Sequence, residues 1–244
     1  MSLTLYPAVD IRDGKAVRLE RGRADAETVY DADPIAAAER WAADGAEWLH
    51  VVDLDAAFEG EPRNRHLIAD IVRATGLPVQ ASGGIRSMRD LEASLGYGAS
   101  RVVIGTMALE EPSFVAAAVA AHGDQVAVGL DADGTTLRAR GWTQDAGDLF
   151  GALHQFTLMG VARVVYTDIA RDGMLGGPNI ARLREVADAT PAHVTASGGV
   201  ASLDDLRALA GAHERVDAAI IGKALYAGRF TLREALDAVA GAAA

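Results

Sequence analysis

Three aspartates in this sequence are candidates for proton-transfer chemistry, and two of them, Asp10 and Asp131, occupy matched places. Asp10 and Asp131 each follow a short apolar run, and each precedes an Asp-Gly pair and then an arginine. Asp172 stands before Gly173, a few residues after Thr167. Two carboxylates on opposite sides of a bound carbon can serve as general base and general acid in one reaction. The alternative is that each aspartate only caps the next helix or turn.

A second motif, Ser-Gly-Gly, occurs twice, and an isoleucine–glycine pair follows each copy. Glycines let a ligand approach the backbone, exposed amides can surround an anion, and the first turn of a helix favours phosphate. The two sets of residues are Ser82, Gly83, Gly84, Gly105 and Thr106, and Ser197, Gly198, Gly199, Gly222 and Lys223. We therefore expect two phosphate sites and a substrate with a phosphate at each end. The alternative is that these glycines only form tight turns.

The motifs recur in the same order at nearly one spacing, which indicates an internal repeat. Ser82 recurs as Ser197, 115 positions later, and Gly105 recurs as Gly222, 117 positions later. Two halves of the chain with one order of motifs are the simplest explanation.

The elements that must hold these residues alternate along the chain. Short β-branched runs predict strands at Leu3–Val9, Trp48–Val52, Pro78–Ala81, Arg101–Ile104, Val126–Leu130, Ala162–Tyr166, His193–Ala196 and Ala218–Ile221. Alanine-rich stretches of helical periodicity predict helices at Pro34–Asp44, Arg63–Thr75, Met88–Tyr97, Pro112–His122, Asp148–Met159, Ile180–Ala189, Leu203–Ala210 and Leu232–Val239. This alternation in 244 residues predicts an α/β chain with a single (β/α)8 TIM barrel, built from two repeated half-barrels and forming one domain over residues 1–244. A doubly wound open sheet is the alternative.

In such a barrel, the residues just past the C-terminal ends of the strands line the active-site face. All the motifs above fall there, and the first and fifth strands, with Asp10 and Asp131, lie opposite each other. Arg18, Arg140 and Trp142 are expected in long polar loops after these two strands, where arginine can pair with phosphate and tryptophan can stack on a flat ring. A solvated arginine and a tryptophan on the rim are the equal alternative.

His50 lies inside the second predicted strand, either as an interior histidine or as a ligand contact. The six histidines have no metal-ligand spacing, and no motif calls for a bound cofactor. We expect neither a metal nor a cofactor.

Composition restricts the class of protein. Half of the residues are hydrophobic, the formal net charge is −11, and cysteine is absent. This acidic balance argues against a general nucleic-acid binder, and the apolar runs are too short to cross a bilayer. We expect a cytoplasmic, monomeric protein that binds neither nucleic acid nor membrane.

Together, the motifs around Asp10, Ser82, Arg140–Trp142, Thr167 and Ser197 resemble one family over essentially the whole chain. The chain is similar to the phosphoribosyl isomerase A family, the actinobacterial dual-substrate form of the histidine-biosynthesis ProFAR isomerase. The resemblance implies an Amadori rearrangement, in which the bisphosphate aminoaldose ProFAR becomes the aminoketose PRFAR by acid–base catalysis.

The resemblance also implies roles for the candidate residues. Asp10 would be the base at the sugar C2, and Asp172 the acid that assists ring opening. Asp131 occupies a position also described as the proton donor, and Thr167 would orient the sugar. The residues that would hold phosphates are Gly84, Arg86, Gly105, Thr106, Gly199, Gly222 and Lys223. Those that would grip the rest of the substrate are Arg18, Arg140 and Trp142.

Ser82 bears on substrate specificity. Histidine-only relatives usually read Gly-Gly-Gly-Ile-Arg here, whereas the dual-substrate enzymes read Ser-Gly-Gly-Ile-Arg, as this chain does. The resemblance therefore implies a second activity on the monophosphate phosphoribosyl anthranilate, in tryptophan biosynthesis. Gln80 and Ala81 depart from the Glu-Leu pair associated with the dual enzymes, which would shift the balance between the substrates. A histidine-only isomerase is the alternative.

Two more distant alternatives remain. The related cyclase of the histidine pathway normally carries lysine where this chain has Arg18, and it needs a glutaminase partner. A catalytically silent phosphosugar-binding barrel would keep both phosphate sites but would not need Asp10 and Asp172 together.

Overall fold

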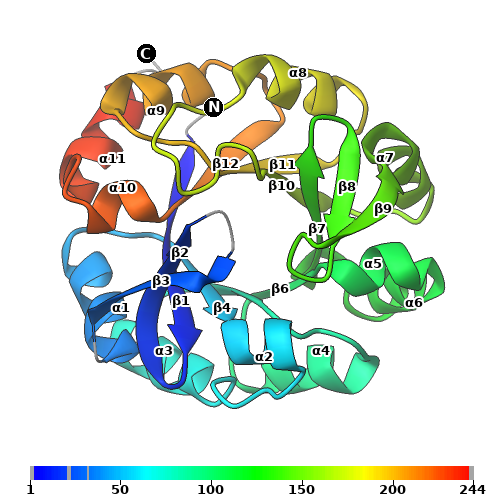
Figure 1. The fold of residues 1–244 in the computed structure, drawn as a ribbon, viewed down its shortest axis with the longest axis horizontal. Coiled ribbons are helices and arrows are strands. Elements are labelled where there is room, and N and C mark those ends of the chain that lie inside the picture. The colour runs from blue at the N-terminus through cyan, green and yellow to red at the C-terminus, as the bar shows by residue number, and fades with distance from the viewer. Residues whose placement is uncertain (1–2, 21–22, 32, 242–244) are drawn as a thin grey trace.

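The computed structural model describes residues 3–20, 23–31 and 33–241, with side chains for 3–17 and 33–241. In these ranges eight parallel strands close into a barrel (Figure 1). They are β1 (Thr4–Arg12), β4 (Leu49–Asp53), β5 (Val79–Ser82), β6 (Arg101–Ile104), β7 (Val126–Asp133), β10 (Arg163–Asp168), β11 (His193–Ser197) and β12 (Val216–Ile221). Because β12 pairs with β1 and β10 pairs with β7, the ring is complete. The predicted (β/α)8 TIM barrel is confirmed.

A longer helix follows each barrel strand and packs outside the ring (Figure 1). Proline suits the first turn of the helices at Pro34–Ala43 and Pro112–His122, and polar side chains cap first turns, such as Asp33 before Pro34 and Ser202 before Leu203. These helices are α1 (Pro34–Ala43), α3 (Leu67–Thr75), α4 (Met88–Gly96), α6 (Pro112–His122), α7 (Leu149–Leu158), α8 (Ile180–Asp188), α9 (Leu203–Ala210) and α11 (Leu232–Ala240).

The apolar core has two parts, as the alternation of strand residues requires. The larger part lies between the strands and the outer helices and includes Leu49, Val128 and Phe156. The smaller part fills the barrel interior and includes Ala8 and Val165.

Two segments expected as polar loops are β-hairpins instead, so that prediction was wrong. β2 (Lys15–Glu20) and β3 (Arg23–Asp31) follow β1, while β8 (Thr136–Ala139) and β9 (Gln144–Asp148) follow β7. Antiparallel pairing with β2 and β8 extends β1 and β7 beyond Asp10 and Asp131, which therefore lie within strands rather than at their ends.

Helix α3 begins at Leu67, four positions later than expected. The preceding Asn64 donates its backbone N–H and its side-chain amide to Asp53, and the amide also donates to Asp55. This buried hydrogen bonding holds the segment outside the helix. Four shorter helices were not expected as separate elements: α2 (Leu54–Glu59), α5 (Thr106–Glu110), α10 (Lys223–Tyr226) and the 3-10 helix η1 (Gly123–Gln125).

The two hairpins and the short helices α5 and α10 follow the sequence repeat, whereas α2 and η1 have no counterpart among the described residues of the other half. A hairpin follows the first strand of each half, β1 and β7, and a short helix follows the last strand of each half, β6 and β12. The two halves therefore share strands, hairpins and short helices in one order, as expected for repeated half-barrels.

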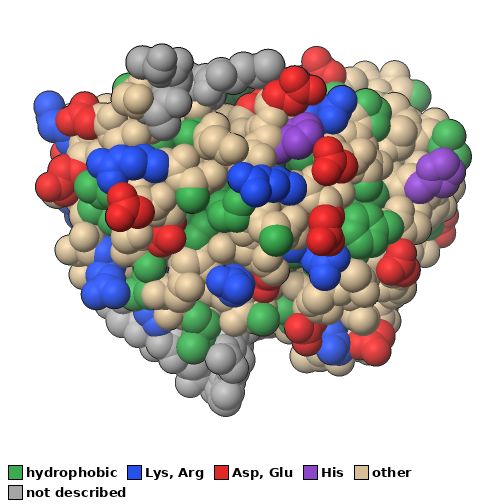
Figure 2. All heavy atoms as spheres, turned by 90° about the horizontal axis from the view of Figure 1, so that it is seen from above, with side chains coloured by type: hydrophobic (Ala, Val, Ile, Leu, Met, Phe, Trp, Pro, Cys, Tyr) green, Lys and Arg blue, Asp and Glu red, His purple; other side chains and the backbone are tan. Residues whose placement is uncertain are grey.

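The surface shown in Figure 2 carries interspersed acidic and basic side chains. Such a face has no broad field of one sign, so a charged ligand would be held by local groups rather than by the whole face. No helix in the described ranges is both long enough and apolar enough to span a membrane.

Candidate active site

A cavity of about 700 Å³ opens at the end of the barrel where the C-terminal ends of the strands meet. Every candidate residue except Arg18 lines it, and the Arg18 side chain lies outside the described side chains. The candidates brought together are Asp10, His50, Ser82, Gly83, Gly84, Arg86, Gly105, Thr106, Asp131, Arg140, Trp142, Thr167, Asp172, Ser197, Gly198, Gly199, Gly222 and Lys223. Residues far apart in sequence therefore share one concave site.

Both Ser-Gly-Gly motifs need their glycines for two reasons. Gly83, Gly84, Gly198 and Gly199 all have positive φ, between 65° and 96°. A Cβ on Gly84 would lie 2.4 Å from Cβ of Ala56, and a Cβ on Gly199 would lie 2.6 Å from the carbonyl oxygen of Gly177. The backbone of each motif is thus in tight contact with the segment that follows the preceding barrel strand, which is α2 at Ala56 and a loop at Gly177. The motif residues also line the cavity.

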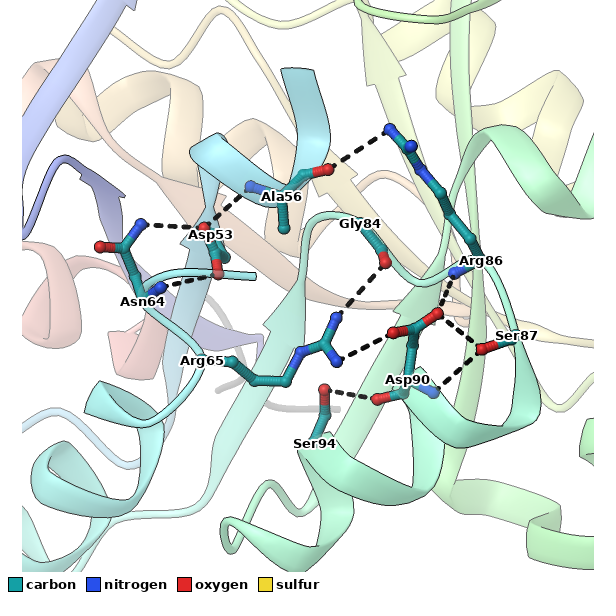
Figure 3. Close-up of polar contacts among 9 residues, drawn as sticks. All are labelled: Asp53, Ala56, Asn64, Arg65, Gly84, Arg86, Ser87, Asp90 and Ser94. Carbon is teal, nitrogen blue, oxygen red and sulfur yellow. Dashed lines mark hydrogen bonds and ion pairs between the residues drawn. The ribbon is translucent and has the colours of Figure 1, made fainter. Parts of the chain in front are cut away.

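Arg65, just before α3, and Asp90 in α4 fix the loop at Gly84 (Figure 3). Arg65 donates to the Gly84 carbonyl at 3.4 Å and pairs with Asp90 at 3.0 Å. Asp90 in turn accepts from the Arg86 N–H at 3.2 Å, and the Arg86 guanidinium donates to the backbone of α2. This arrangement keeps a cation and a glycine backbone on the same side of the cavity.

The acids lie on opposite sides of the cavity. Asp10 is on β1, Asp131 is on β7, and Asp172 follows β10 in a turn where its N–H donates to the Asp168 carbonyl. Each of the three carboxyl-bearing residues is partly accessible. They border a space in which a bound carbon could exchange protons with two of them.

Asp131 has a hydrogen-bonded environment of its own. Trp142 donates from Nε1 to Oδ2 of Asp131 at 2.7 Å, and Thr167 is its register partner on β10. Burial raises the pKa of the Asp131 carboxyl, although hydrogen bonds from Trp142 and Thr167 act in the opposite direction. A raised pKa increases the fraction that can donate a proton.

The loop that carries Arg140 and Trp142 is strained. Positive φ angles occur at Arg140 (52°), Gly141 (65°) and Trp142 (68°). This backbone region is energetically unfavourable for residues other than glycine. The Arg140 N–H donates to the Thr106 hydroxyl at 3.1 Å, and its guanidinium pairs with Glu110 at 2.7 Å. The loop is thereby fastened to α5.

Sequence reasoning did not assign Glu110 or Phe58 to this site, and it noted Gln80 only as a departure from the motif of the dual-substrate enzymes. Glu110 and Phe58 line the cavity, and Phe58 lies close to Gly141. Gln80 lies beneath the cavity, hydrogen-bonded to His50. Only Gln80 gave a signal, because it precedes Ser82 by two positions on one strand and so faces the same side of the sheet. In the part of the chain described, no three His, Asp or Glu side chains form a group that could hold a metal ion.

Sequence comparison places this barrel among known proteins. A sequence model of the family described as "Histidine biosynthesis protein" matches residues 4–231, nearly the whole chain. The chain belongs to this family. Within the histidine biosynthesis family it is 56% identical over 237 residues to phosphoribosyl isomerase A of Streptomyces coelicolor, covering 97% of this chain and 98% of the relative.

Other relatives in the histidine biosynthesis family carry isomerase names as well. A Frankia casuarinae protein is 58% identical over 241 residues, covering 99% of this chain and 94% of the relative. A Bifidobacterium longum protein is 54% identical over 239 residues, covering 97% and 98%. Both are named as phosphoribosyl-substituted imidazole-4-carboxamide isomerases, the activity abbreviated ProFAR isomerase. This member of the family is thus an enzyme, an isomerase, which confirms the resemblance found in the sequence.

Proposed function

We propose that this isomerase converts ProFAR to PRFAR in histidine biosynthesis and also rearranges phosphoribosyl anthranilate in tryptophan biosynthesis. The main support for the proposal is one cavity that has aspartates on opposite walls and a Ser-Gly-Gly loop from each half of the barrel. Relatives named for the first reaction are 54% to 58% identical over nearly the full length.

In the proposed reaction, the first step opens the ribose ring. Asp172 protonates the ring oxygen as the C1–O bond breaks, and the nitrogen on C1 forms a protonated imine. Thr167 lies on β10 near this acid and orients the sugar. A carboxylic acid placed at the leaving oxygen supplies general acid catalysis without any bound cofactor.

The second step moves a proton on the opened chain. Asp10 removes the proton from C2, and the enolamine gains a proton at C1 while its C2 hydroxyl becomes the ketone. Asp131 faces Asp10 across the barrel, and its raised pKa supports it as an alternative proton donor. The phosphates rest on the two glycine loops, one with Arg86 and the other with Lys223.

The second activity is supported by the shape of the site rather than by the names of relatives. Ser82 lies 3.5 Å from His50 within the cavity wall, and the Arg140–Trp142 loop lines the same cavity. Arg140 can pair with an anionic group and Trp142 can stack on a flat amine ring, so one loop can meet two different aromatic amines.

Steady-state kinetics of the purified protein on both substrates tests this proposal. Turnover of both supports the dual isomerase. Turnover of ProFAR alone would limit the enzyme to the histidine pathway. Turnover of neither, with tight bisphosphate binding, would favour the silent phosphosugar-binding barrel instead.

A further inference from the structure

A line of polar side chains crosses the barrel interior beneath the cavity. Arg101 on β6, Gln80 on β5 and His50 on β4 occupy directly paired register positions. Arg101 donates to Oε1 of Gln80 at 3.2 Å, and Nε2 of Gln80 lies 3.1 Å from Nδ1 of His50. Gln80 is fully buried and His50 is 7% exposed, so water does not replace these contacts.

The donor and acceptor types along this line fix the protonation of the histidine. A guanidinium has only donors, so Gln80 must turn its carbonyl oxygen toward Arg101 and its NH2 group toward His50. Because the amide nitrogen can only donate, Nδ1 of His50 must accept. The ring then carries its proton on Nε2. A second proton on Nδ1 would set two donors against each other in a buried place.

The far end of the line is held firmly. Arg101 also donates to the Tyr6 hydroxyl at 3.2 Å, and its guanidinium carbon lies 4.7 Å from the centroid of the Trp48 ring. Tyr6 and Trp48 are themselves stacked, with centroids 5.3 Å apart. A guanidinium fixed in this way presents its N–H to Gln80 in one geometry.

The near end of the line reaches the cavity. Nε2 of His50 lies 3.5 Å from the Ser82 hydroxyl, and both residues line the cavity wall. Among the described side chains, the titratable or charged ones on neighbouring strands that share this interior include Tyr6 and Asp10 on β1 and Arg101 on β6.

In the second half of the barrel, the described residues place no histidine at the position equivalent to His50. Val165 stands 115 positions after His50, and Thr195 stands 115 positions after Gln80. Thr195 accepts from Arg163 at 3.0 Å, and Arg163 pairs with Asp217 at 2.6 Å. The half-barrel repeat therefore preserves the strands but not the histidine, which indicates that His50 has a role specific to the first half of the barrel.

We propose that Arg101 and Gln80 are positioning residues that hold His50 in its neutral Nε2–H form, so that it offers an uncharged N–H donor on the Ser82 side of the cavity. This rests on the proposed function, since the acceptor is an uncharged oxygen of the phosphoribosyl substrate, such as a sugar hydroxyl. An uncharged donor can bind such an oxygen without attracting a phosphate away from its glycine loop.

The ring nitrogens of His50 can be observed directly in the whole protein. Two-bond 15N–1H spectra of the wild type, with His50→Asn to assign the signals, should show an unprotonated Nδ1 and a protonated Nε2 at neutral pH. A protonated Nδ1 would overturn the proposal. This readout does not depend on turnover, so inactivity toward both substrates would refute the proposed function and leave the tautomer to be decided by the spectra.

Gln80→Glu is the informative variant, because the carboxylate keeps the contact with Arg101 but demands a proton on Nδ1. We expect the His50 proton to move to Nδ1 and kcat/KM to fall about tenfold where the ring is neutral, the loss of about one hydrogen bond. Activity should recover at lower pH, where the imidazolium restores the Nε2–H.

Thr195→Val is the matched control, since it removes a buried hydrogen bond at the repeat-equivalent position without touching His50. Its His50 signals and pH profile should match the wild type. An unchanged tautomer in Gln80→Glu, or the same pH limb in Thr195→Val, would reduce Gln80 to a structural residue and overturn the proposal.

Discussion

Asp131 lowers the free energy of unfolding at neutral pH, where a carboxyl with a raised pKa would serve as the proposed proton donor. Burial raises its pKa above the ordinary value of 3.8, so the folded state binds a proton that the unfolded chain releases more readily. Between the unfolded and the folded pKa, the native state holds more protons, and the free energy of unfolding falls as pH rises. This loss of stability at neutral pH accompanies the proposed role of Asp131 in proton transfer.

Asp131→Asn should therefore raise the melting temperature at neutral pH. The amide oxygen still accepts from Trp142, while the buried charge is removed. Thermal unfolding measured across a pH series should show this gain shrinking as the pH is lowered toward the ordinary range of an aspartate. A gain that is equal at all pH values would contradict the raised pKa.

Asp10→Asn should remove the proposed base without removing the ligand site. We expect kcat on ProFAR to fall about 10³-fold, within the usual range for loss of a general acid or base, with the dissociation constant of PRFAR nearly unchanged. A large loss of kcat, with PRFAR binding retained in isothermal titration calorimetry, would support Asp10 as the base. Turnover near the wild-type rate would show that another group takes the C2 proton.

At the scale of single elements, the glycine loops should tolerate no side chain. Gly84→Ala would place a Cβ 2.4 Å from Ala56 at a φ of 65°, and we expect it to cost about 3 kcal/mol of unfolding free energy. Gly76→Ala is the matched control, with a φ of 68° and open space around the new Cβ, and should cost only about 1 kcal/mol. Urea unfolding measures both, and equal losses would contradict the close-contact argument.

The sequence predicted the elements whose signals are local. Runs such as Arg101–Ile104 are β-branched and bounded by polar residues, and each predicted barrel strand is present within a few residues of its expected ends. The hairpin after β7 was missed although its two strands are close in sequence, because Gln144–Asp148 is mostly exposed and has no alternation of buried residues.

The candidate site shows a similar contrast between residues that belong to a recognisable motif and residues that do not. Glycine motifs and paired aspartates have recognisable spacing, so they could be proposed before the structure was known. Glu110 has none, because a single polar residue in a helix gains meaning only from the side chain it meets, here Arg140.

At the scale of the whole molecule, we expect a monomer of 25.4 kDa by light scattering. The large apolar side chains that are well exposed among the described residues, Tyr97, Leu158 and Met174, lie on three separate segments and form no continuous patch of the kind that joins subunits. A particle of twice that mass at micromolar concentration would contradict this expectation.

The repeated halves of the barrel also bear on how a two-ended ligand is read. In the proposed reaction, the two similar Ser-Gly-Gly loops admit a ligand with a phosphate at each end in two opposite orientations, and only one of these brings the reacting sugar to the proposed acid and base. The orientation of the ligand must therefore depend on side chains that differ between the two halves of the cavity. One such difference is His50 in the first half and Val165 at the equivalent position of the second. This difference makes the cavity asymmetric, although its backbone repeats.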